Sequence, residues 1–335
     1  MKGRMTVKKI LTMLLTLALA CALSVCALAE YPVTLTDQAG REVTIENKPE
    51  HIVSGYYIST SACIALGLSD RMAAVEAKAD TRNIYALSAP ELISLPNVGT
   101  AKNFNLEACL TAEPDLVILP KRLSEAAESI SAFDIPVLLV NPEDDELLAQ
   151  MLLLIGAATE TEDRATDLNA FILTQLGMCQ EMLKNETPVT ALILGNSDKL
   201  TCAPNGMYQA SLLKNACAVN AAADIEGTKW AEISYEQLLA MNPQAIIIPA
   251  EAVYTAEDVL GDAELAELDA VKNGAVYQMP KAFEAWDSPV PSGVLGVLWT
   301  AKMLHPQTYG EAQYKDAAKM LYETYYGFTP DEAAL

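Results

Sequence analysis

The sequence predicts an α/β protein made of two similar lobes that are joined by one long helix. Strand-like and helix-like segments alternate in both halves of the chain, which is typical of parallel sheets covered by helices. A long helical segment without proline separates the two halves. One short sequence pattern also occurs once in each half.

Length and composition agree with two folded lobes and exclude a disordered chain. The chain has 335 residues, of which 51% are hydrophobic and 20% are charged. This is enough for two domains with substantial cores. The 44 acidic and 22 basic side chains give a net charge of −22. Such a surface repels nucleic acid and anionic lipid, so we expect neither as a partner.

The segment 1–29 has the pattern of a secretory signal peptide. Basic residues come first, the apolar stretch ILTMLLTLALA follows at 10–20, and Ala27-Leu28-Ala29 forms a small-x-small cleavage site. Lipidation at Cys21 or Cys26 and an uncleaved anchor helix are alternatives. Cleavage removes four of the 22 basic side chains and none of the 44 acidic ones, so the net charge becomes −26.

The first half then alternates strands and helices. A hairpin is expected at 33–47, because the residues alternate in polarity around a turn at Gln38-Ala39-Gly40. Helices are expected at 58–68, 106–112 and 124–133, and the stretch from 79 to about 98 is expected to be irregular. Strands are expected at 51–57, 72–78, 116–119 and 136–140.

Two consecutive helices interrupt this alternation. One is expected at 144–159 and a longer one at 161–185, which has a single internal glycine and no proline. At 1.5 Å per residue the second helix would be about 35 Å long. A helix of that length can connect two lobes.

The alternation starts again after Pro188. Strands are expected at 189–195, 245–249 and 275–279. Helices are expected at 207–218, 235–241, 256–270, after Pro289 or Pro291, and from about 310 to 326.

The repeated pattern relates the two halves to each other. NLEACLTAEPDLVIL at 105–119 matches SYEQLLAMNPQAIII at 234–248 without a gap. The match pairs Glu107 with Glu236 and Pro114 with Pro243. Each copy lies at the same point of its own lobe. Two lobes enclose a cleft, and clefts between domains are preferred ligand sites.

The sequence resembles a known family in four segments in the same order: VTLTDQAGREVTIENKPEHIVS, LPNVGTAKNFNLEACLTAEPDLVIL, NACAVNAAADIEGTKWAEISYEQLLAMNPQAIII and SPVPSGVLGVLWTAKMLHP. It is similar to the substrate-binding proteins of ABC importers for ferric siderophores, haem and cobalamin. The resemblance covers nearly all of residues 31–309. It implies the class III periplasmic binding protein fold, with two Rossmann-like lobes joined by a single helix. The expected parts are a signal peptide (1–29), an N-terminal lobe (30–158), the inter-lobe helix (159–187) and a C-terminal lobe (188–335).

The resemblance also implies a function. The protein would be a secreted monomer, periplasmic or on the cell surface, that captures a metal complex between its lobes and delivers it to an ABC permease and its ATPase. The expected cargo is a siderophore complex, haem or a corrinoid, and no cofactor is expected. A small oxyanion such as molybdate or tungstate is the alternative, as is a sensor that takes no part in transport. One exposed glutamate per lobe would dock on the permease, and the matching positions are Glu107 and Glu236. First-turn glutamates behind the N-caps Asn105 and Ser234 have a structural explanation too, because they stabilise the helix dipole.

Candidate ligand-binding residues lie in loops after strands and near helix starts, where a cleft between α/β lobes takes its side chains. Aromatic and cationic groups there would suit a large anionic complex, although each residue also has a packing or capping explanation. The candidates are Tyr56, Tyr57, Arg82, Tyr85, Lys121, Arg122, Asn196, Tyr208, Trp230, Trp286, Asp287 and Ser288.

Other functional classes find less support. A free metal ion would need several His and carboxylate ligands, and the chain has only His51 and His305. We also find no GxSxG, P-loop, HExxH or GxGxxG motif, so the sequence does not predict an enzyme.

Overall fold

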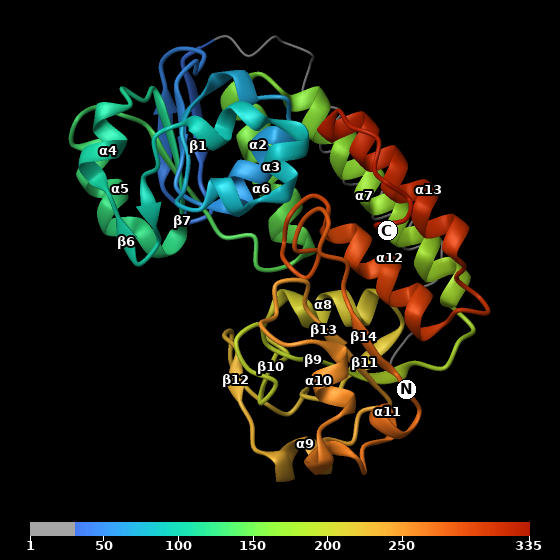
Figure 1. Ribbon diagram of the computed structural model, residues 1–335. Coiled ribbons are helices and arrows are strands. Elements are labelled where there is room, and N and C mark those ends of the chain that lie inside the picture. The colour runs from blue at the N-terminus through green and yellow to red at the C-terminus, as the bar shows by residue number, and fades with distance from the viewer. Residues whose placement is uncertain (1–30) are drawn as a thin grey trace, which may run out of the picture.

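The computed structural model describes residues 31–335. The predicted signal peptide, with Cys21 and Cys26, lies outside the described residues. Two α/β lobes lie at opposite ends of helix α7 (Glu162–Leu183), as Figure 1 shows. The predicted fold class is therefore confirmed. Within residues 31–335, no helix combines the length and the apolar character that crossing a membrane requires.

The first lobe contains a four-stranded parallel sheet with the order β4-β3-β7-β8. Its strands are β3 (Ile52–Ser54), β4 (Met72–Ala74), β7 (Leu116–Pro120) and β8 (Val137–Val140). All five residues of β7 are buried, as expected of a central strand covered on both faces. Helices of this lobe include α2 (Tyr57–Ala65), α4 (Leu106–Thr111) and α5 (Ser124–Ser131).

The second lobe has a parallel sheet of the same design, with the order β11-β9-β13-β14. Its strands are β9 (Val189–Ile193), β11 (Ala218–Asn220), β13 (Ala245–Ile248) and β14 (Val276–Gln278). Helices α8 (Tyr208–Asn215) and α9 (Tyr235–Met241) belong to this lobe.

The repeated sequence pattern occupies the same position in both sheets. In the first lobe it forms α4 and then β7, and in the second it forms α9 and then β13. Each of these strands is third in its sheet, next to the strand that begins the lobe. The N-caps are equivalent too, because Asn105 accepts a bond from Ala108 N and Ser234 accepts one from Gln237 N. The two halves therefore repeat one design.

Helices α6 (Asp145–Thr159) and α7 lie between the two sheets in sequence, as predicted. Helix α12 (Gly293–Leu304) packs on α7, and α13 (Glu311–Leu321) packs on α12. The following turn η6 (Tyr322–Tyr326) returns to the first lobe, where the Tyr326 hydroxyl lies 3.2 Å from Ser61 Oγ. The C-terminal segment therefore contacts both lobes, and the predicted domain boundaries remain predictions.

Three stretches differ from the expectation. The helix expected at 207–218 ends at Asn215, and Ala218 begins strand β11, where no strand was expected. The stretch expected to be irregular contains η2 (Ala79–Thr81), α3 (Asn83–Ser88) and η3 (Pro90–Ser94). The helix expected at 256–270 is divided into α10 (Ala256–Leu260), η5 (Ala263–Leu265) and α11 (Asp269–Lys272). The division begins at Gly261, after which Asp262 caps a new turn by accepting a bond from Glu264 N. Shorter elements are η1 (Ser69–Arg71), β5 (Gly99–Thr100), β6 (Asn103–Phe104), η4 (Lys121–Leu123), β10 (Thr201–Cys202) and β12 (Ala231–Glu232).

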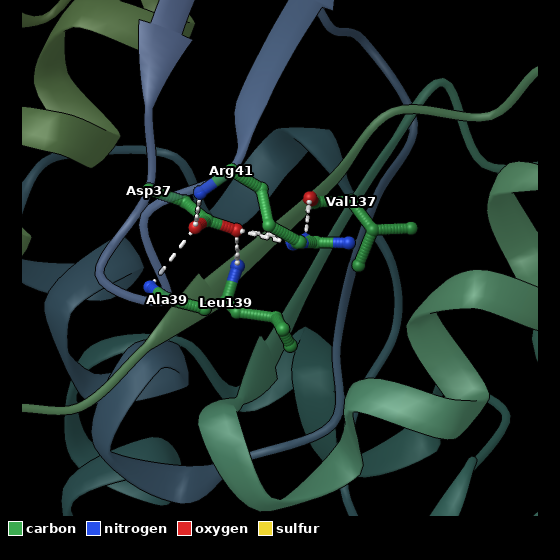
Figure 2. Close-up of polar contacts among 5 residues, drawn as sticks. All are labelled: Asp37, Ala39, Arg41, Val137 and Leu139. Carbon is green, nitrogen blue, oxygen red and sulfur yellow. Dashed lines mark hydrogen bonds and ion pairs between the residues drawn. The ribbon is translucent and has the colours of Figure 1, made fainter.

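The N-terminal hairpin, β1 (Val33–Thr36) and β2 (Glu42–Ile45), is fastened to the first sheet by one carboxylate. Figure 2 shows Asp37 in the hairpin turn, accepting bonds from the backbone nitrogens of Ala39, Arg41 and Leu139. The Arg41 guanidinium pairs with Asp37 at 2.7 Å and also donates to Val137 O. Leu139 belongs to β8, so this cluster fixes the hairpin to the edge of the sheet.

Candidate functional site

The carboxyl ends of strands β3, β7 and β13 contribute to the walls of a cleft between the lobes. In both sheets the first strand of the lobe lies between the second and the third strands, so the order reverses there. Ligands of open α/β sheets bind at the carboxyl ends of the strands, at such a reversal. Tyr56 follows β3, Lys121 follows β7, and Glu251 follows β13 of the second lobe.

One part of this cleft is a cationic pocket of about 450 Å³, which we call the outer pocket. The first lobe contributes Tyr56, Lys121 and Arg122, and the second contributes Thr228 and Lys229. Within residues 31–335, none of its three cationic side chains forms an ion pair with a carboxylate. Glu143 is the one acidic residue in its lining. The pocket is therefore positive in a strongly acidic protein, as an anion site requires.

Two adjacent aromatic rings with a cation at each end form a row that runs from this pocket to Arg82. The Arg122 guanidinium carbon lies 5.2 Å from the ring centroid of Tyr56. The Tyr56 and Tyr57 rings meet edge to face at 5.8 Å. The Arg82 guanidinium carbon lies 4.4 Å from the ring centroid of Tyr57. Cation–π contacts of this kind hold both guanidinium groups in place.

The inner end of the cleft contains a direct bridge between the lobes. Arg82 Nη1 of the first lobe donates to Glu251 Oε1 of the second at 2.7 Å. Asn83 Nδ2 donates to Lys281 O beside it at 3.1 Å. These residues, with Tyr57, Tyr85 and Glu284, line what we call the inner pocket.

Three buried carboxyl groups lie in or next to the wall of the inner pocket: Glu284 lines it, Glu76 contacts the lining residue Tyr85, and Asp287 lies two positions after the lining residue Ala285. Glu76 accepts bonds from Thr60 Oγ1 at 2.6 Å and Tyr85 Oη at 2.7 Å, and Glu284 accepts one from Ser292 Oγ. Burial raises the pKa of both glutamates. Burial also raises the pKa of Asp287 to about 6, although a bond from Gln209 partly opposes the shift. Burial favours the neutral form of all three carboxyl groups, which reduces the negative charge next to the cleft.

The structure brings together six of the twelve candidate ligand residues. Tyr56, Lys121 and Arg122 line the outer pocket, and Tyr57, Arg82 and Tyr85 line the inner pocket. Tyr85 is nonetheless 1% exposed and donates to Glu76, so it supports the wall from behind.

The other six candidates line neither pocket. Trp286 is fully buried and donates to Tyr322 Oη at 2.8 Å. Tyr208 is 4% exposed and faces a small cavity beside α7. Asn196 and Trp230 are half-buried near Gly195, and Asp287 and Ser288 precede α12. The position of a charged or aromatic residue directly after a strand indicates that the residue lies near the cleft. It does not indicate the direction in which the side chain points.

Sequence reasoning missed Lys229 and Glu251. Lys229 lies in a long loop, where the sequence pattern gives no signal. A signal for Glu251 is present, because the alignment that pairs Glu107 with Glu236 also pairs Arg122 with Glu251. The two lobes therefore present opposite charges at equivalent points of the cleft.

The predicted docking residues Glu107 and Glu236 are both exposed, in the first turns of α4 and α9. Hydrogen bonds from Ser234 and from the backbone lower the pKa of Glu236, so its carboxylate stays charged at neutral pH. Both lie at equivalent places on the two lobes.

The two histidines have structural partners. His305 is buried and its Nε2 lies 3.1 Å from Cys217 O, and His51 Nδ1 lies 3.3 Å from Glu113 O. Among residues 31–335, no group of three or more His, Cys, Asp or Glu side chains is placed to hold a metal ion.

Two parallel-sheet lobes, a connecting helix and a cleft lined from both sides define the class of two-lobed solute-binding proteins. A model of the periplasmic binding protein family matches residues 52–283, which is more than half of the chain. The chain belongs to this family, as the sequence resemblance predicted.

Individual relatives cover almost the whole chain. The molybdate-binding protein MolA of Haemophilus influenzae is 26% identical over 96% of this chain and 98% of its own length. An uncharacterised ABC transporter substrate-binding lipoprotein of Bacillus subtilis is 27% identical over 84% of this chain and 88% of its own. The solved structure of Haemophilus influenzae MolA with molybdate superimposes with a TM-score of 0.80, covering 89% of this chain and 99% of that chain at 23% identity.

Proposed function

We propose that this protein is the solute-binding component of an ABC importer and that its solute is an anion held between the lobes. The observation that carries the proposal is the outer pocket, where Lys121, Arg122 and Lys229 converge from both lobes without a carboxylate partner in the described chain. An anion placed there interacts with both lobes at once. The role is binding and delivery, so the solute should be recovered chemically unchanged.

A tetrahedral oxyanion such as molybdate or tungstate is the solute class that the site supports best. Three of the aromatic residues expected to stack on a flat macrocycle, Tyr85, Tyr208 and Trp286, are buried instead. What remains at the cleft is mainly cationic and polar, which suits an oxyanion. The near full-length relative MolA, whose name gives molybdate as its ligand, favours the same class.

An anionic metal complex remains the second candidate. The volume of the outer pocket, about 450 Å³, falls within the range of pockets that bind drug-sized molecules. The Tyr56 ring lines it and offers one stacking surface. A ferric siderophore, haem or a corrinoid would use these features.

Thermal-shift and calorimetric titrations with molybdate, tungstate, a ferric tricatecholate, haem and cyanocobalamin test the solute class. At a hundredfold excess over Kd a bound solute adds about 2.7 kcal/mol to the free energy of unfolding, which raises Tm by several degrees. We expect this with the oxyanions. The double substitution Lys121→Gln/Arg122→Gln should weaken binding about fivefold or more, because it removes two cations from the outer pocket. Lys319→Gln, an exposed position on α13, is the matched control. Binding of none of the five solutes would refute the proposed solute class.

We further propose that Glu107 and Glu236 dock the protein on its permease, one from each lobe. Exposed carboxylates at equivalent positions suit two basic sites on a partner with two similar halves. Replacing both by Lys should abolish uptake in cells and leave solute affinity unchanged, because neither lines the cleft pockets. Uptake at the normal rate by the double variant would exclude this role.

A further inference from the structure

The bridge between Arg82 and Glu251 places a carboxylate of the protein on a guanidinium group of the cleft, in the pocket next to the one that carries the proposed anion function. Arg82 immediately precedes α3 in the first lobe, and Glu251 follows β13 in the second. Their atoms Nη1 and Oε1 are 2.7 Å apart. A carboxylate and an oxyanion present the same oxygen acceptors to a guanidinium group.

The Arg82 guanidinium group can donate more hydrogen bonds than it donates in this structure. Its side chain is 21% exposed, its guanidinium rests on the Tyr57 ring, and Nη1 is engaged by Glu251. Its Nε is buried and has no acceptor among residues 31–335. A buried donor without an acceptor is costly, so an oxyanion that reached this edge would gain a bond that the protein does not supply.

Glu251 is held less firmly than Arg82. Its side chain is 48% exposed, and within residues 31–335 its one side-chain hydrogen bond is the bond to Arg82. A half-exposed ion pair contributes little to stability, so a competing anion can break it at small cost. The guanidinium is thus fixed by its surroundings, while the carboxylate is free to leave.

We propose that Glu251 is a built-in competitor of the solute, and that the incoming anion displaces its carboxylate from Arg82. The ion pair between the lobes is exchanged for a bridge through the solute. The inference rests on the proposed anion-binding function and deepens it: the outer pocket attracts the anion into the cleft, and Arg82 is the guanidinium group that then binds it. It also gives a selectivity rule: a solute must offer Arg82 a better acceptor than one carboxylate, which favours doubly charged oxyanions over singly charged anions.

Calorimetric titration with molybdate and with tungstate tests this competition. Glu251→Gln removes the competing charge and keeps the size of the side chain. We expect it to bind both probes about fivefold more tightly than wild type, the factor that corresponds to a half-exposed ion pair. Glu257→Gln is the matched control, because Glu257 is exposed on α10 of the same lobe and lines neither pocket. It should change affinity less than twofold.

Arg82→Gln, made alone and together with Glu251→Gln, identifies the group that is competed for. Both variants should lose affinity at least tenfold relative to their parents. Far-UV circular dichroism and the Tm without solute verify that each variant is folded. Unchanged binding by folded Arg82→Gln, or an effect of Glu251→Gln no larger than that of Glu257→Gln, overturns the inference.

The wild-type titration separates this inference from the proposed function. If wild type binds an oxyanion and Glu251→Gln binds it no more tightly, only the competition is wrong. If wild type fails to bind and Glu251→Gln binds, the competition is supported, while the oxyanion function of the wild-type protein is refuted. If neither binds, the oxyanion function and the inference fall together.

Discussion

At the residue scale, Asp37 shows how one buried carboxylate organises the start of the fold. It accepts bonds from three backbone nitrogens and from the Arg41 guanidinium, and it is 4% exposed. Asp37→Asn removes the charge and at least one acceptor from this cluster. We expect the free energy of unfolding to fall by about 3 kcal/mol, because a buried charged group loses its bonds while its partners stay buried.

Urea denaturation measures this loss. Asp316→Asn is the control, since Asp316 is exposed on α13. It should change the free energy of unfolding by less than about 0.5 kcal/mol. Equal stability of the two variants would show that the hairpin is held by its strand contacts instead.

Asp287 makes stability depend on pH. Burial raises its pKa to about 6 from the usual 3.8, so the folded state binds this proton more tightly than the unfolded state. Stability is therefore lost as pH rises from about 4 to about 6, by up to about 3 kcal/mol. Asp287→Asn has no proton to lose, and it should gain stability relative to wild type over this range.

Chemical denaturation of both proteins at intervals from pH 4 to pH 7 checks this sign. The difference in the free energy of unfolding, variant minus wild type, should rise with pH and level off above pH 6. A difference that is flat, or that falls with pH, would mean that Asp287 ionises normally in the folded protein.

At the scale of elements, two helical glycines make opposite predictions. A Cβ added at Gly177 of α7 would meet no atom within 4 Å, whereas one added at Gly156 of α6 would lie 2.8 Å from the Cβ of Ala165. Gly177→Ala should raise the free energy of unfolding by about 0.5–1 kcal/mol through helix propensity. Gly156→Ala should lower it by about 1–3 kcal/mol through overlap between α6 and α7.

Each variant serves as the control of the other in the same denaturation experiment. A loss of stability in Gly177→Ala would mean that the exposed face of α7 is packed against something in solution. A gain in Gly156→Ala would mean that α6 and α7 separate easily.

The elements also show where sequence patterns succeed and fail. The predicted strands at 116–119 and 245–249 are confirmed, because each is a continuous buried apolar run after a capped helix. The prediction of a single helix at 256–270 is wrong. The apolar residues keep a helical spacing throughout this segment, although the chain forms three separate short helical elements. Tertiary contacts of Val259, Leu265 and Ala270 bury each turn separately. The spacing of apolar residues shows which face of a helix is apolar, but it does not show whether the helix is continuous.

At the scale of the whole molecule, the connection between the lobes predicts a small closing motion. Helix α7 runs without a break over 22 residues, α12 packs on it, and η6 returns to the first lobe. Because the lobes are joined by a continuous helix and by more than one contact within residues 31–335, we expect a solute to change the relative position of the lobes only slightly.

Solution X-ray scattering with and without saturating molybdate or tungstate measures this motion. The radius of gyration should change only slightly. A large compaction on binding would contradict the stiff connection, and Glu251→Gln would then be the variant with which to examine the open form.

The sequence by itself determined the two-lobed α/β fold, the long connecting helix, the internal repeat and the family. Each of these features is visible in short stretches of the sequence: the period of the apolar residues, the helix caps and the pattern that recurs in both halves. Such local patterns can be read without knowing which residues are in contact in the folded protein. Only the tertiary structure decided which residues meet within each wall of the cleft and across it. Tyr57 and Arg82 proved to form one row with Tyr56 and Arg122, and Trp286 was turned into the core. The pairing of Arg82 with Glu251 depends on how the lobes are oriented, which no local pattern encodes.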